Sequence, residues 1–196
     1  ETITRSYPLW QSDTQCCGRA EPVQDQTQNA GLSLYVPLHS AGVWAFDPYH
    51  FRSIATTGCA LCPDIYQDKE TMAAARRMIA EVKELRPYYL GDYYPLTEII
   101  PGERCWCGWQ YDRPDLAGGF LALFRRSGSN YCAAKIPLKG LDADATYILS
   151  VGEGGAKQVK SGKELGTGLK VEIPEKPGCV LIRYRKRQAD RTCTGS

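Results

Sequence analysis

CVLIRYRK, residues 179–186, and GLKVEIP, residues 168–174, end a series of short apolar runs that decides the fold. The earlier runs are WCGWQYDRP (106–114), GGFLALFRRS (118–127), AKIPLKGL (134–141) and ATYILSV (145–151). They are rich in β-branched and aromatic residues, and turns containing Gly, Pro or Asp separate them. Regular spacing of this kind predicts an antiparallel β-sandwich over residues 91–196.

A single strong helix pattern precedes these runs. Residues 68–86 place apolar side chains on one face at helical spacing, namely Met72, Ala75, Ile79, Val82 and Leu85. The opposite face carries Arg77, Glu81 and Glu84, while Asp68 and Pro87 suit the two ends. The pattern predicts an outer amphipathic helix covering a sheet, packed through Met72, Ile79 and Val82. Residues 1–90 are therefore predicted to form a mixed α/β unit.

Composition excludes several classes of protein. Of the 196 residues, 43% are hydrophobic and 23% charged, as in ordinary globular chains. The net charge of +2 gives no electrostatic reason to expect nucleic acid or an anionic membrane as a partner. No apolar run approaches the roughly 18 residues of a membrane span. The basic cluster over residues 183–191 is interpreted as a solvated tail.

Nine cysteines allow two interpretations. Cys59 and Cys62 form a C-x-x-C pair, and Cys105 and Cys107 a C-x-C pair, so a structural zinc site is one of them. The pairs are irregular, however, and scattered reduced thiols would suit a cytoplasmic protein. The chain opens at Glu1 without a signal-peptide pattern, and we expect a preceding N-terminal portion.

The segment PLWQSD, residues 8–13, is predicted to form a short apolar strand that ends in a carboxylate. At the carboxyl end of a strand in a parallel barrel, a side chain opens into the active site. Trp10 beside Asp13 would raise the pKa of that carboxyl, as a general acid requires. The alternative is that Asp13 only caps a turn or a helix. A second segment, QNAGLSLYVP over 28–37, reads as a buried strand.

Five segments in order carry a family resemblance. PLWQSD, QNAGLSLYVP, YHFRS (49–53), GDYYPLT (91–97) and QYDRPDLAGGFLALFRRS (110–127) together resemble melibiase-type α-galactosidases of glycoside hydrolase clan D, family 36-like. The likeness is strong over residues 4–127 and looser to about 185. It implies the C-terminal part of a catalytic (β/α)8 TIM barrel over 1–90, followed by an antiparallel β-sandwich over 91–196.

The resemblance also implies site residues and chemistry. Asp13 matches the family's general acid/base, while Trp10, Gln28 and Arg52 fall on motif positions near the substrate pocket. Such enzymes retain anomeric configuration and use two carboxylates, with no metal or organic cofactor. The family's nucleophile lies in a K-x-D-type motif that this sequence lacks, so we expect it upstream. The implied substrate is an oligosaccharide with a terminal α-galactoside, or a related α-glycoside.

Several of these residues also allow other interpretations. Asp47, Tyr49 and Arg52 could hydrogen-bond sugar hydroxyls, although Asp47-Pro48 could equally form a turn. The tyrosines of residues 88–94 could bind sugar or pack against the neighbouring part of the chain. A non-catalytic carbohydrate-binding module would explain the sandwich, but not the helix at 68–86.

Overall fold

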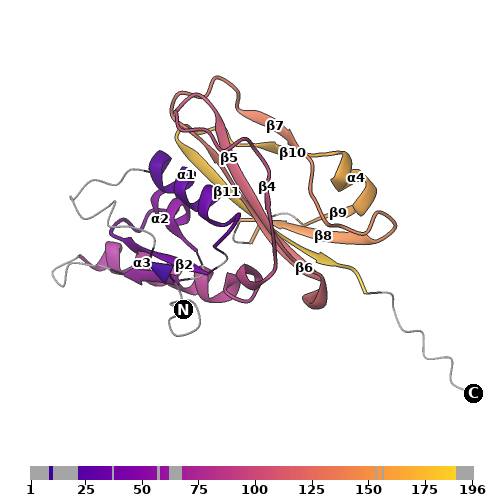
Figure 1. Ribbon diagram of the computed structural model, residues 1–196, viewed down its shortest axis with the longest axis horizontal. Coiled ribbons are helices and arrows are strands. Elements are labelled where there is room, and N and C mark those ends of the chain that lie inside the picture. The colour runs from indigo at the N-terminus through magenta and orange to yellow at the C-terminus, as the bar shows by residue number, and fades with distance from the viewer. Residues whose placement is uncertain are drawn as a thin grey trace, which may run out of the picture.

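The computed structural model describes residues 9–10, 22–36, 38–56, 58–61, 68–152, 154–155 and 157–188. Its first half is a small parallel sheet with helices, and its second half is dominated by a large antiparallel sheet (Figure 1). The chain is therefore mixed α/β, with strand pairing that changes from parallel to antiparallel along the sequence.

The parallel sheet alternates with helices. Its strands, in spatial order, are β1 (Leu9–Trp10), β2 (His39–Val43) and β3 (Gly58–Leu61). The helices are α1 (Pro22–Leu32) between β1 and β2, α2 (Pro48–Ile54) between β2 and β3, and α3 (Lys69–Leu85) after β3. Parallel neighbours need such crossovers. Ala41 and Val43 of β2 face the helices, because they share an apolar core with Phe51 and Met78.

The prediction of a strand over 28–37 was wrong. Residues up to Leu32 belong to α1, and a turn follows in which the Val36 amide donates to the Leu32 carbonyl. The buried face of α1 is largely polar, with Gln26 and Asn29 bonded to Ser53. A helix that buries polar side chains shows no apolar stripe, so the apolar end of the segment was mistaken for a strand.

Carboxylates start both of the following helices. The Asp47 side chain accepts hydrogen bonds from the amides of Tyr49 and His50 at 3.1 Å, so Asp47-Pro48 begins α2 rather than a turn. The Asp68 side chain accepts from the amides of Glu70 and Thr71 at 2.8 Å. Each carboxylate satisfies two amides that lack a partner within the helix.

The helix predicted over 68–86 is confirmed as α3, with a shifted buried face. Ala75, Val82 and Leu85 are buried as expected, but Met78 is buried as well, while Met72 and Ile79 are only half-buried. The prediction that Glu81 lies on the solvent face was wrong, since only 3% of it is exposed. The buried face of the helix is therefore rotated to one side of the predicted stripe, away from Met72 and Ile79 and towards Met78 and Glu81.

The second half is antiparallel, as predicted. Six strands form one sheet in the order β4-β5-β6-β11-β8-β9, and two more form the ladder β10-β7. Their bounds are β4 (Asp92–Pro95), β5 (Trp106–Arg113), β6 (Gly118–Arg125), β7 (Ala133–Ile136), β8 (Thr146–Val151), β9 (Lys157–Ser161), β10 (Leu169–Glu172) and β11 (Gly178–Lys186). A short helix, α4 (Gly162–Thr167), connects β9 to β10.

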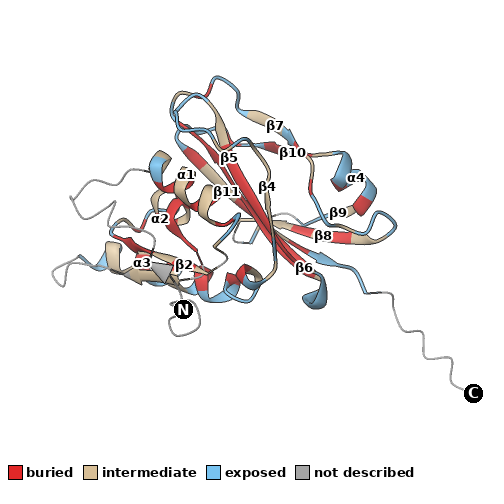
Figure 2. Cartoon of the chain, viewed as in Figure 1, coloured by how far each residue is buried: buried red, intermediate tan, exposed pale blue. Residues whose placement is uncertain are grey.

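Both faces of the large sheet are covered, which buries its central strands β5, β6 and β11 (Figure 2). On one face, residues such as Leu121, Leu149 and Ile182 pack against Leu165 of α4 and Val171 of β10. The two layers enclose this apolar core, which supplies the burial that a sandwich needs.

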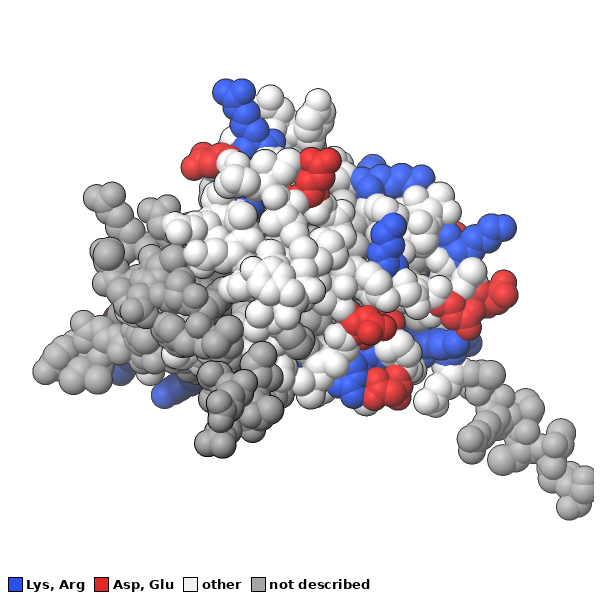
Figure 3. All heavy atoms as spheres, viewed as in Figure 1, with Lys and Arg blue, Asp and Glu red and all other residues white. Residues whose placement is uncertain are grey.

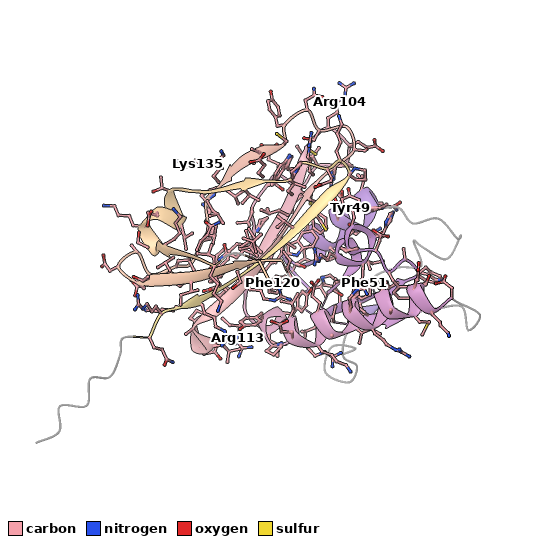
Figure 4. All side chains as sticks on the ribbon, turned by 180° about the vertical axis from the view of Figure 1, so that it is seen from behind. Tyr49, Phe51, Arg104, Arg113, Phe120 and Lys135 are labelled. Atoms are coloured by element: carbon pink, nitrogen blue, oxygen red, sulfur yellow. The ribbon has the colours of Figure 1, made fainter. Side chains whose placement is uncertain are left out.

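The other face carries a cluster of aromatic rings that reaches the helices. The cluster, called the aromatic seam here, contains Tyr49, Tyr89, Trp109, Tyr111, Phe120 and Phe124. Tyr89 lies 4.9 Å from Tyr111 and 5.2 Å from Phe120 between ring centroids. Tyr49 of α2 meets Phe124 edge-on at 6.0 Å. Figure 4 shows Tyr49 and Phe51 on the helical side with Phe120 on the strands. Helices and large sheet thus share one core.

Candidate functional site

The carboxyl ends of the parallel strands lie at one edge of the small sheet. Val43 pairs with Leu61, and these are the last residues of β2 and β3. β1 runs in the same direction, with Trp10 opposite Ser40. In folds built from parallel strands and helices, chemistry takes place at this edge. We therefore take it as the candidate site and call it the carboxyl edge.

Trp44 provides an apolar surface at the carboxyl edge. It directly follows β2, and 36% of it is exposed. A Cβ atom added to Gly42 would lie 2.1 Å from Cζ3 of Trp44, so the ring folds back over the Gly42 backbone. Gly42 alternates with Ala41 and Val43, which face the helices. The indole ring therefore lies on the face of the sheet that is turned away from the helices.

The structure describes the side chains of only two of the four predicted site residues, Gln28 and Arg52. Asp13 lies outside the described residues, three positions after Trp10, the last residue of β1. Gln28 lies half-buried on α1, in the half of the helix that leads towards the start of β2. Arg52 lies on α2. Of the four, Trp10 alone is placed on a strand that leads to the carboxyl edge.

Arg52 forms a buried ion pair. Its Nε and Nη2 atoms each donate to a carboxylate oxygen of Glu81 on α3 at 2.7 Å. Its Nη1 atom lies 3.5 Å from Sγ of Cys179 on β11. Burial alone would lower the pKa of Arg52, but the hydrogen bonds and charge of Glu81 raise it. In the described structure the guanidinium joins α2, α3 and the large sheet.

A second polar network lies beneath α1. The guanidinium of Arg126, 1% exposed, donates from Nε to Oε1 of Gln26 at 2.8 Å. Its Nη1 atom donates to the carbonyls of Ile100 and Gly102 at 2.7 Å. Gln26 in turn donates to Ser53 at 2.9 Å. A buried charge requires such partners, and here they fix α1 and α2 against the large sheet.

His39 is the fully buried first residue of β2. Its Nε2 atom lies 3.0 Å from the hydroxyl of Ser33, which is also 3.0 Å from the hydroxyl of Tyr111. Burial lowers the pKa of His39 to about 4, because the interior disfavours the charged imidazole. The ring is therefore neutral at neutral pH. It lies at the amino end of β2, which is the end opposite to the carboxyl edge. We therefore assign His39 a structural role.

A cavity of about 420 Å³ opens between the start of α2 and the first half of α3. Phe46 and Met78 line it and also belong to the core between β2 and the helices. It therefore lies on the helical side of the small sheet. The exposed indole of Trp44 lies on the opposite side, so the two features are separate.

The described residues show neither a metal-binding cluster nor a membrane-spanning helix. Within the described residues, no group of three or more His, Cys, Asp or Glu side chains is placed to hold a metal ion. The cysteines that the structure describes are free thiols: Cys59, Cys105, Cys107, Cys132 and Cys179. Cys62, the second cysteine of the C-x-x-C pair, lies outside the described residues. No described helix has the length and apolar character to cross a bilayer.

No model of a known protein family and no curated protein matches the sequence. Solved structures do match the fold. The GH36 α-galactosidase AgaA from Geobacillus stearothermophilus superposes with a TM-score of 0.70 at 20% identity over 86% of this chain. AgaB from the same organism gives 0.68 at 21% identity over 86%, and the Lactobacillus brevis α-galactosidase 0.71 at 15% identity over 87%.

The match covers most of this chain but only part of each solved structure. This chain spans 25% of the length of each of these structures. A single-site variant of AgaA has also been crystallised in complex with 1-deoxygalactonojirimycin, and this chain covers 25% of that structure as well. The chain therefore shares the fold of about a quarter of a GH36 α-galactosidase.

Proposed function

We propose that this chain is the C-terminal part of a retaining glycoside hydrolase that cleaves terminal α-galactosides. The observation that carries the proposal is the superposition of 86% of the chain on AgaA. The resemblance of five segments of the sequence, in order, to motifs of that family supports it. Residues 1–90 would be the end of the catalytic (β/α)8 barrel, and 91–196 the sandwich that follows it. The parallel strands and crossover helices of the first half support this assignment.

Asp13 is proposed as the general acid/base. It follows β1 in the sequence, and the carboxyl edge is where barrel enzymes place such groups. In the first step it would protonate the oxygen of the leaving group while a second carboxylate attacks C1. In the second step it would deprotonate the attacking water. The second carboxylate belongs, in this proposal, to the part of the barrel that precedes this chain.

Trp44 is proposed as a platform for the substrate. Its exposed ring lies at the carboxyl edge, and the apolar face of a hexose packs well on a flat indole. This role rests on the position of the ring over Gly42. Trp10, Gln28 and Arg52 remain predicted contacts from the family motifs.

Replacing Trp44 in the full-length enzyme should weaken substrate binding. We expect Trp44→Ala to lower kcat/KM by about tenfold through a higher KM. The loss of one ring contact is expected to weaken substrate binding by about that factor. Trp44→Phe should keep most of the activity. Tyr131→Ala, which removes an aromatic side chain that is 76% exposed on the antiparallel half, serves as the control and should have no effect. Unchanged kinetics in Trp44→Ala would assign the ring to packing.

The proposed function is tested by comparing two proteins in the hydrolysis of nitrophenyl α-galactoside. The full-length protein, with the preceding part of the barrel, should release nitrophenol. The 196-residue chain alone should release none, because an acid without its nucleophile cannot form the glycosyl-enzyme intermediate. Turnover by the short chain would contradict the proposal that the nucleophile lies in the part of the barrel that precedes it. Sugar binding without turnover by the full-length protein would favour a carbohydrate-binding module.

A further inference from the structure

A second cavity, of about 370 Å³, lies far from the small sheet in the antiparallel half. It opens where α4 crosses from β9, at the edge of the six-stranded sheet, to β10 of the second layer (Figure 1). Leu165 and Leu169, both buried, contribute apolar surface. Lys135, Lys160 and Lys170 also line it. We call it the lysine pocket.

The lysine pocket carries an excess of positive charge. Three lysines against the single acidic residue Glu164 leave a formal charge of +2 on its lining. The Glu164 carboxylate is already engaged, because it accepts from the amide and hydroxyl of Ser161 at 2.8 and 3.0 Å. It also lies 3.5 Å from Nζ of Lys160. Basic and acidic side chains are both visible around α4 at the right of Figure 3.

Two of the lysines are direct cross-strand neighbours. Lys170 of β10 is paired with Lys135 of β7 in the antiparallel ladder. Among the described residues, neither forms an ion pair with an acidic side chain. Like charges in directly opposite positions destabilise a ladder. An anion bound between the two amines would turn this repulsion into attraction.

The backbone restricts the position of Lys135. A Cβ atom at Gly168 would lie 2.7 Å from Cγ and 3.0 Å from Cε of Lys135, so the lysine stem runs along the glycine backbone. Gly168 has a φ of +133°, in the region that favours glycine. Figure 4 shows Lys135 at the outer ladder of the antiparallel half. The absence of a side chain at residue 168 therefore leaves room for the lysine that faces the pocket.

We propose that the lysine pocket binds a phosphate group, carried by a small organic phosphomonoester. Lysine amines bind phosphate as point charges with three donors each, and the amide of Gln158 on the lining adds a further donor. The volume of about 370 Å³ exceeds what a bare phosphate requires and falls in the range of small-ligand pockets. The apolar contribution of Leu165 and Leu169 suits the organic part of the ligand.

The proposal is tested by isothermal titration calorimetry of the full-length protein at constant ionic strength, with inorganic phosphate, glycerol 3-phosphate and glycerol as probes. We expect both phosphates to bind one site per chain and glycerol not to bind. Tighter binding of glycerol 3-phosphate would identify the organic ester as the preferred form, and tighter binding of inorganic phosphate would overturn that part of the proposal. No phosphate-dependent heat beyond that of sodium chloride would overturn all of it.

A double variant separates the site from general charge. Lys135→Gln combined with Lys170→Gln should weaken phosphate binding at least about tenfold, since each lost charged hydrogen bond is worth about that factor. Without ligand the double variant should unfold at the same or a higher temperature, because the like charges are gone. Lys163→Gln, on α4 but outside the lining, should bind like the wild type. Equal weakening in both variants, or a lower unfolding temperature of the double variant, would contradict the proposal.

Discussion

In the full-length enzyme, Asp13→Asn is expected to slow hydrolysis of a natural galactosyl disaccharide by about 10²–10⁴-fold, the usual contribution of general acid catalysis. The loss should be far smaller in the first step on an activated nitrophenyl galactoside. A sugar alkoxide is a strong base and needs a proton as it leaves, whereas a nitrophenolate leaves with little help. Steady-state kinetics with both substrates measure this difference directly.

The second step provides an independent readout of the same substitution. Without Asp13 as a base, water attacks the glycosyl-enzyme slowly, so the covalent intermediate should accumulate with the activated substrate. Azide needs no deprotonation and should restore turnover, leaving a galactosyl azide of retained α configuration. Asp144→Asn, which changes an exposed turn carboxylate, is the matched control and should behave like the wild type. Equal losses on both substrates without azide rescue would assign Asp13 to a capping role.

Arg52→Met should lower the free energy of unfolding by about 3 kcal/mol, the lower end of the range for breaking a buried pair. The substitution leaves Glu81, which is 3% exposed, without its two short hydrogen bonds. Nη2 of Arg183 remains 3.9 Å from the carboxylate and keeps the loss at that lower end. Equilibrium unfolding in denaturant measures the effect.

The double variant Arg52→Met with Glu81→Met should recover most of this loss, because two packed apolar side chains replace a desolvated pair. Asp115→Asn is the control: it removes the charge from the Arg113–Asp115 pair, in which the aspartate side chain is 61% exposed, and should leave the free energy of unfolding close to that of the wild type. The same variants decide how Arg52 acts. A stable Arg52→Met protein with a raised KM would identify the predicted substrate contact instead of the structural pair.

The sequence predicted best those elements whose burial is apolar. Asp68 and the apolar spacing after it located α3, and the short runs rich in β-branched and aromatic residues around Val171 and Ile182 predicted the antiparallel strands. The burial of polar side chains could not be predicted from the sequence pattern. Glu81 was assigned to solvent because its partner Arg52 lies 29 residues earlier in the chain. Gln26 and Asn29 are buried because Ser53 of another helix bonds them.

The candidate site was only partly predictable for the same reason. The strand that ends at Trp10 was visible in the order of residues, but Trp44 was missed. A tryptophan two positions after a strand glycine was the available signal, since Gly42 leaves room for the ring to fold back. Only the pairing of β2 with β3 shows that this ring reaches the carboxyl edge. Spacing along the chain does not report such lateral neighbours.

The aromatic seam has a consequence for how the protein is made. Tyr49 and Tyr89 leave the ribosome well before β11, whose last residue is Lys186, completes the large sheet that covers them. At about 5–20 residues per second, roughly 100 further residues take about 5–20 seconds to translate. During that time the helical half has an uncovered aromatic face. Chaperone contacts during synthesis are therefore expected to concentrate on this half, and premature stop codons in β6 or β11 should yield insoluble products.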